Sequence, residues 1–200
     1  MDSLTFCTDG KTLYKVGEDD WLAVSQNDGE VVLVNAGFCK GVEFGCKWSD
    51  ADFNNNLKAQ SGQNILEYTN SLADEYYSDI KRAIVPRDVT CRNQKDLGAG
   101  NIKDAYMWPM SKEELEAVPM VNDTICRNTG RPIWTRTFAE YSQTGESYRA
   151  WGSCIDEKSK KGIFMSIETT EDFCCVLPAF CLRKSSIGRI SANNKVVLKL

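Results

Sequence analysis

The hydrophobic and polar positions of the first quarter of the chain predict a β-hairpin. Apolar residues fill positions 21–24, and a second apolar run occupies 31–34 within the segment Glu30–Asn35. The polar residues Asn27, Asp28 and Gly29 separate the two runs. An Asp-Gly pair between two short β-prone runs is typical of a tight hairpin turn. We therefore expect two adjacent antiparallel strands here.

Over residues 48–82 the spacing of the apolar positions becomes that of a helix. Ser49 and Asp52 resemble a helix-capping pair, and a Ser-Gly break follows at 61–62. From Ile65 to Ile80, apolar or aromatic residues recur every three to four positions, which indicates one buried face of an amphipathic helix. Pro86 ends the pattern. At this spacing the tyrosines of the segment are expected to pack in the core, not to form a ligand-binding box.

Residues 93–101 predict a polar loop, and 104–110 predict a short buried strand. Gly98 and Gly100 in that loop are not followed by the Gly-Lys-Ser/Thr ending that a phosphate-binding loop requires, so no nucleotide site is expected. Ser111 and Glu114 form the signature of a capping box, which predicts a short helix over 111–115.

The last third of the chain has apolar β-prone runs at 132–137 and 176–182, and further strands are expected at 163–167 and 195–200. The polar and aromatic sequence between the first two runs predicts a long, irregular, solvent-facing region over about 138–175. Loops that a rigid scaffold positions are frequent binding sites. The order of strands, then helices, then strands predicts an α+β fold with a mainly antiparallel sheet, in one domain over 1–200.

The amino-acid composition excludes some classes of binding partner for the protein. The 200 residues are 42% hydrophobic and 26% charged, with a net charge of −4. Nucleic-acid-binding proteins carry a basic footprint, so neither a nucleic acid nor an anionic membrane surface is expected as partner. No apolar run approaches the roughly 18–20 residues of a membrane span. The first residues lack the basic and apolar regions of a secretion signal, so we expect the cytoplasm or a virion as location.

The nine cysteines show no repeat and no CxxC pair, and the chain contains no histidine. A zinc site is therefore not expected, and serine–histidine or cysteine–histidine catalysis is excluded. In a protein without a secretion signal, the cysteines are expected to be reduced, with several buried as small apolar residues. Acidic residues are numerous, so a hydrolase with paired carboxylates stays open, although no spacing points to one.

Six segments of the chain carry a resemblance when they are taken in order: 21–35, 48–58, 80–86, 105–115, 134–137 and 176–182. Together they resemble an uncharacterised bacterial and phage domain family. That family is similar to C-type-lectin-like domains, including the sulfatase-modifying (formylglycine-generating) group and the variable proteins of diversity-generating retroelements. Leu177 occupies a position at which the family has an arginine.

The resemblance implies a C-type-lectin-like fold, in which small twisted sheets and two main helices support a long loop region, here 138–175. Tyrosine, tryptophan and arginine dominate binding hot spots, with adaptable polar residues around them. The predicted ligand-binding residues are Tyr141, Gln143, Tyr148, Arg149 and Trp151. The alternative for Trp151 is that it packs the loop onto the sheet.

The function expected from these observations is non-enzymatic: a binding module that displays the 138–175 face to a protein or glycan ligand. Two alternatives remain. The first is a structural virion component, in a homo-oligomer or virion assembly. The second is a copper-dependent thiol oxidase that uses Cys175 with Cys181 or Cys174. No metal or cofactor is expected for the binding module, since the Glu-Pro-Asn calcium motif is absent and Asn122-Asp123 precede the loop.

Overall fold

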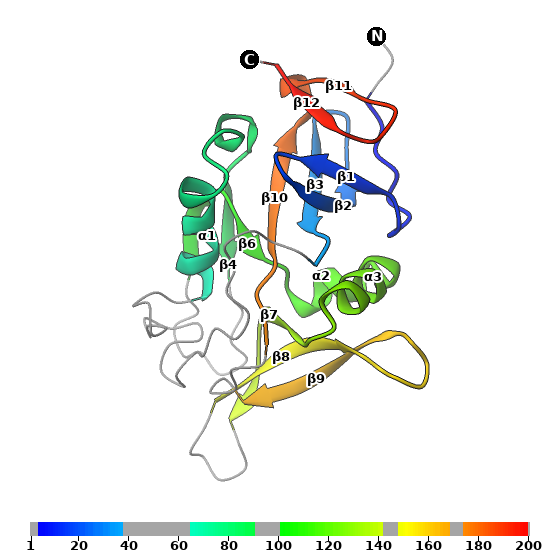
Figure 1. Cartoon of the computed structure of the whole chain (residues 1–200). Helices are drawn as coiled ribbons and strands as arrows, with labels where there is room; N and C mark the ends of the chain where they lie inside the picture. Colours follow the sequence, from blue (N-terminus) through cyan, green and yellow to red (C-terminus); the bar gives the residue numbers. More distant parts are fainter. Residues whose placement is uncertain (1–3, 38–64, 91–100, 142–147, 169–173, 200) are drawn as a thin grey trace.

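A five-stranded antiparallel sheet forms one half of the molecule (Figure 1). The computed structural model describes residues 4–37, 65–90, 101–141, 148–168 and 174–199. In the sheet, the N-terminal strands lie beside a strand from near the C-terminus, because β3 pairs with β10. The strands, in spatial order, are β1 (Leu13–Val16), β2 (Asp19–Gln26), β3 (Glu30–Asn35), β10 (Pro178–Arg183) and β6 (Trp108–Pro109).

The predicted hairpin is confirmed as β2 and β3. The Asn27 side chain fixes the turn, since its Oδ1 accepts hydrogen bonds from the backbone N–H groups of Gly29 and Glu30, each at 2.9 Å. Trp21 faces Asn35 in the antiparallel register. Local turn chemistry is therefore sufficient to set this pairing.

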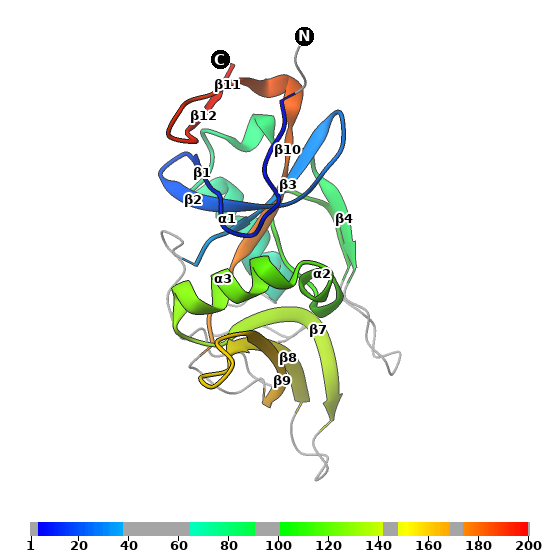
Figure 2. The ribbon, with the colours of Figure 1, turned by 90° about the vertical axis from the view of Figure 1, so that its right-hand side faces the viewer.

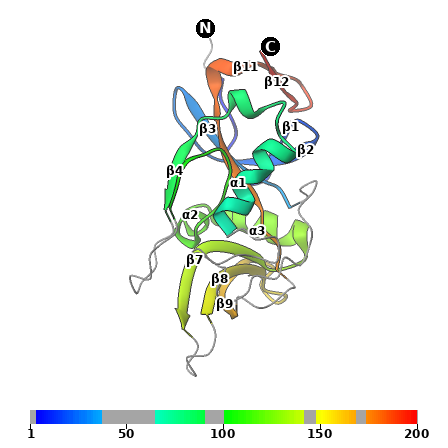
Figure 3. The same ribbon diagram turned by 90° about the vertical axis from the view of Figure 1, so that its left-hand side faces the viewer.

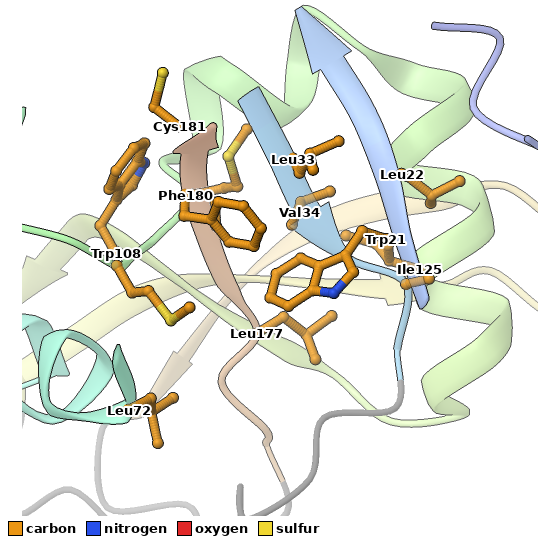
Figure 4. Packing of buried hydrophobic residues seen from close by; sticks show 14 of the residues in the cluster. Trp21, Leu22, Leu33, Val34, Leu72, Trp108, Ile125, Leu177, Phe180 and Cys181 are labelled. Carbon is orange, nitrogen blue, oxygen red and sulfur yellow. The ribbon is translucent and has the colours of Figure 1, made fainter. Parts of the chain in front are cut away.

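The core lies between this sheet and α1 (Ile65–Glu75). The Trp21 ring packs edge-on against Phe180 of β10 and Tyr77, with ring centroids 4.5 and 5.5 Å apart (Figure 4). The helix contributes buried apolar residues on one face, as its sequence period predicts. Tyr77 is buried as expected, but Tyr76 is 45% exposed. Residues 48–64 of the predicted helix, including its Ser49 cap, lie outside the described residues.

Small elements extend this half of the molecule on either side. The strand predicted over 104–110 is split between the end of β5 (Asn101–Ala105) and β6. The C-terminal strand is confirmed as β12 (Val196–Leu198), next to β1 through a 3.0 Å bond from Lys15 N to Asn194 O. The loop over 93–100 lies outside the described part. The remaining elements are β4 (Arg87–Thr90), η1 (Lys81–Ala83), η2 (Lys184–Ser186) and β11 (Ile187–Ile190).

Two helices, α2 (Lys112–Glu116) and α3 (Pro119–Thr129), lie between the large sheet and a smaller one (Figure 2). The predicted capping box of α2 is confirmed: Glu114 N donates to Ser111 Oγ at 3.1 Å, and Ser111 N donates to Glu114 Oε2 at 2.9 Å. Helix α3 is not among the elements that the sequence predicts. Pro119 stands in its first turn, and Gly130 ends it with φ +59°, which is the usual placement of the two residues at a helix.

The second half of the fold is a three-stranded antiparallel sheet of β7 (Ile133–Tyr141), β8 (Tyr148–Ile155) and β9 (Gly162–Glu168) (Figures 1 and 3). The expectation of a long irregular region over 138–175 is therefore wrong for most of its described residues, whereas the strand predicted at 163–167 is confirmed within β9. The turn between β8 and β9 contains Asp156, which is half-buried, and Glu157, which is exposed. The coarse prediction of an α+β fold with mainly antiparallel sheets is confirmed. Among the described helices, none is long and apolar enough to span a membrane.

Candidate functional site

The predicted ligand-binding residues fall at one end of the three-stranded sheet. Tyr141 ends β7 and Tyr148 begins β8, and the two are directly paired across the strands. Arg149 and Trp151 follow on β8, two positions apart and therefore on one face of the sheet. Gln143 lies outside the described residues, and for the two tyrosines only the backbone is described. The structure thus gathers the described part of this set at a strand end.

Arg149 connects β8 to β9. Its Nε donates to Ser166 Oγ at 2.8 Å, and its Nη2 donates to the Ser166 carbonyl oxygen at 2.6 Å. Nη1 lies 3.4 Å from Glu168 Oε1. The guanidinium is held by three acceptors on the neighbouring strand, so it acts first as a cross-strand connection. A role in ligand contact stays a prediction.

Trp151 is half-buried and takes part in a cation–π contact. Lys112 Nζ of α2 lies 4.9 Å from the centroid of its ring and 5.5 Å from that of Phe164 on β9. The same ammonium pairs with Glu116 at 2.5 Å. Trp151 thus packs between the sheet and α2, which fits the alternative in which it holds this region in place.

A buried polar cluster fixes the same face of the sheet on α3. Ser153 Oγ of β8 donates to Asn122 Oδ1 at 2.7 Å and lies 3.1 Å from Cys126 Sγ. The neighbouring Asp123 accepts from the backbone N–H of Gly162 at 2.6 Å. Ser153 is fully buried and Asn122 is 2% exposed. These bonds seat β8 and the start of β9 against the helix.

Replacing Asn122 with alanine is expected to lower the free energy of unfolding by about 1–3 kcal/mol, because Ser153 would keep its burial and lose an acceptor. Urea unfolding followed by circular dichroism measures the change. Asn193→Ala, in an exposed turn, is the control and should change stability by less than about 0.5 kcal/mol. If Asn122→Ala also lowers the free energy of unfolding by less than about 0.5 kcal/mol, the cluster does not anchor the sheet.

The opposite face of β8 and β9 carries an apolar surface that we name the outer patch: Cys154, Ile163 and Met165. Ile163 and Met165 are 44% and 42% exposed. Cys154 is paired with Ile163 across the strands, and its Sγ lies 3.3 Å from Met165 Sδ. The three side chains therefore form one continuous surface of two strands.

The outer patch adjoins a strand edge. In the described residues β9 pairs with β8 alone, so its other side is an edge of the sheet. No charged residue or proline occurs from Gly162 to Ile167. Edge strands are normally guarded by lysine, proline or bulges, because their free backbone groups can pair with another chain. An apolar, unguarded edge is the most distinctive surface feature of this half of the molecule.

Four of the six described cysteines are buried, so the expectation that several are buried is confirmed. Cys7 is exposed and Cys154 is half-buried, whereas four are buried. Burial raises the pKa of Cys126 and of Cys181 to about 11. Cys181 Sγ accepts from Arg87 Nη2 at 3.0 Å and donates to Glu30 Oε2 at 3.4 Å, an arrangement that suits a neutral thiol. The buried cysteines are Cys126, Cys174, Cys175 and Cys181.

The copper alternative, in which Cys175 acts with Cys181 or Cys174, stays untested. All three of these cysteines are buried, and Cys181 lies on β10. Within the described residues, no group of three or more histidine, cysteine, aspartate or glutamate side chains could hold a metal ion.

These environments predict an order of thiol labelling. In a pulse of iodoacetamide at about pH 8, the exposed Cys7 should react first among the described cysteines. Cys126 and Cys181 should react about a hundredfold more slowly than an ordinary thiol, because a pKa of about 11 leaves about a hundredth of the usual thiolate. Mass spectrometry of the digested protein measures each site. Equal labelling of Cys181 and Cys7 in the folded protein would contradict the buried placement.

Comparison of the chain with protein-family models, curated proteins and solved structures finds no match. The resemblance to C-type-lectin-like domains therefore stays a prediction, and the functional argument rests on the site itself.

Proposed function

We propose that the protein is a non-enzymatic binding module that recognises a protein ligand through the outer patch and the adjoining edge of β9. The observation that carries this proposal is the exposure of Ile163 and Met165 on a strand whose second edge pairs with no other strand in the described part of the chain. Exposed apolar surface at an open edge is the kind of feature that another chain covers. Of the two expected ligand classes, protein fits better, because the patch offers apolar groups and no side-chain hydrogen-bond partners for sugar hydroxyls.

The mode of recognition that we propose is strand addition. An extended peptide segment pairs with the backbone of β9, which supplies affinity, and places alternate side chains on Ile163 and Met165, which supplies specificity. Arg149 faces Glu168 at the end of β9. A ligand strand that continues past Glu168 would approach the end of the sheet at which β8 begins with Tyr148 and β7 ends with Tyr141.

The double variant Ile163→Asp with Met165→Asp tests this function. Peptides are selected from a random library for binding to the protein, and their affinity is measured by calorimetry. Two charges on the contact surface should weaken binding at least about tenfold, since burying an unpaired carboxylate opposes association. The melting temperature should change little, because both side chains are exposed.

Met120→Asp is the matched control, since Met120 is another exposed methionine, at 48%, on α3. Its affinity for the same peptides should equal that of the unchanged protein. If the double variant binds within twofold of the unchanged protein, or if Met120→Asp weakens binding equally, the outer patch is not the site.

A structural role, in an oligomer or a virion, would use the same surface with another copy of the chain as partner. Sedimentation velocity over a range of concentrations separates the two functions. The binding module is expected to sediment as a monomer. If the unchanged protein self-associates and Met165→Asp abolishes that association, the outer patch serves assembly and the proposal of ligand recognition is wrong.

A further inference from the structure

A second, separate site is suggested by a pocket of about 240 Å³ between the large sheet and α2. Its walls are mainly apolar: Val24 and Val32 come from β2 and β3, Trp108 from β6, and Met110 and Val118 flank α2. Pockets for drug-sized ligands measure about 300–1,000 Å³. The volume therefore suits a smaller molecule, such as one ring or a short hydrocarbon chain with one polar group.

Two charged side chains, Arg87 and Glu114, are among the described residues that line the pocket. Glu114 is already neutralised, because its Oε2 and Oε1 accept from Arg136 Nη1 and Nη2 at 2.6 and 2.7 Å. It therefore adds little net charge to the pocket. Arg87 is also paired, with Glu30, but this ion pair uses only one of the three guanidinium nitrogens.

Arg87 makes both of its side-chain hydrogen bonds through one nitrogen. Nη2 donates to Glu30 Oε2 at 2.8 Å and to Cys181 Sγ at 3.0 Å. A guanidinium has five N–H donors, so the two on Nη1 and the one on Nε have no acceptor among the described residues. These donors remain for a ligand, while Glu30 holds the side chain in position.

We infer that this pocket binds a small monocarboxylate with an apolar body. The carboxylate accepts from the remaining Arg87 donors, and the ring or chain lies against Trp108, Met110 and the valines. Charge-assisted bonds from arginine to a carboxylate are stronger than bonds between neutral groups, and they select for that group by its shape. This inference is independent of the outer patch, which lies on the other sheet.

Phenylacetate and phenylacetamide are the probes, because they share the ring and differ in charge. The protein is labelled with ¹³C at its methionine methyl groups, of which Met110 lines the pocket, whereas Met120 and Met165 lie on other surfaces. Phenylacetate should shift the Met110 signal alone and reach saturation at millimolar concentration. Phenylacetamide should bind at least about tenfold more weakly.

Two variants locate the binding. Ala117→Trp places a large side chain at the pocket lining and should abolish the Met110 shift, whereas Ala192→Trp, in an exposed turn, should leave it unchanged. A Met110 signal that phenylacetate does not move would overturn the inference. Equal affinity for both probes would overturn it as well, since Arg87 would then take no part.

Discussion

Replacing Trp21 with alanine is expected to lower the free energy of unfolding by about 3–5 kcal/mol. Trp21 is fully buried, and its ring contacts Phe180 and Tyr77. Its Nε1 donates to the carbonyl oxygen of Val16 at 3.2 Å. One side chain thus joins the hairpin, β10 and the segment after α1. Alanine would leave a cavity where three parts of the core meet.

Urea unfolding followed by circular dichroism measures this loss, which would remove much of the total stability of about 5–15 kcal/mol that a domain of this kind has. Tyr76→Ala is the control, because Tyr76 is a large aromatic residue near the same region that is 45% exposed. It should cost less than about 1 kcal/mol. A Trp21→Ala loss below that value would mean that the core is not centred on this ring.

Gly10→Ala is expected to cost about 2–4 kcal/mol, the second-largest effect. Gly10 has φ +69°, a left-handed conformation that costs a side-chain-bearing residue about 1–3 kcal/mol. In addition, a Cβ there would lie 2.6 Å from the backbone carbon of Met120 and 2.7 Å from Val121 N. Neither backbone atom can move without shifting α3. The N-terminal segment therefore depends on glycine for its approach to the helix.

Gly17→Ala separates strain from crowding. Gly17 has nearly the same φ, +64°, but a Cβ there would meet no atom within 4 Å. Its substitution should cost about 1 kcal/mol, from backbone strain alone. Thermal unfolding of both variants gives the difference. Equal losses for the two would show that the N-terminal segment does not pack closely on α3.

Local signals were sufficient to predict some elements of the fold. The turn at Asn27 and the box of Ser111 and Glu114 are each complete within four residues, so no distant contact is needed to specify them. The pairing of β3 with β10 joins residues about 150 positions apart, such as Val32 and Cys181. Nothing in either strand alone specifies that partner.

Strand β8 was missed because both of its faces are partly covered, whereas β7 and β9 contain the strands predicted at 132–137 and 163–167. On β8, Ala150 and Gly152 are buried on one face, while Trp151 and Ser153 meet α2 and α3 on the other. A strand covered on both faces loses the alternation that marks a half-buried strand. The sequence therefore resembled an irregular region.

The sequence predicted the region of the candidate site but not the residues that form its surface. Arg149 was recognisable as a residue typical of binding surfaces, but its partners Ser166 and Glu168 follow from a strand register that the sequence does not specify. Ile163 and Met165 alternate with Phe164, so apolar residues occupy both faces of β9. Only the position of α3 and α2 decides which face stays exposed.

Hydrogen exchange of the protein, alone and with a library-selected peptide bound, tests the proposed site most directly. Strand addition on β9 predicts slower exchange at backbone amides within Gly162–Glu168, with little change on β1, β2 and α1. Unchanged exchange throughout β9, with protection elsewhere on the protein, would contradict the proposal that this edge and the outer patch bind the ligand.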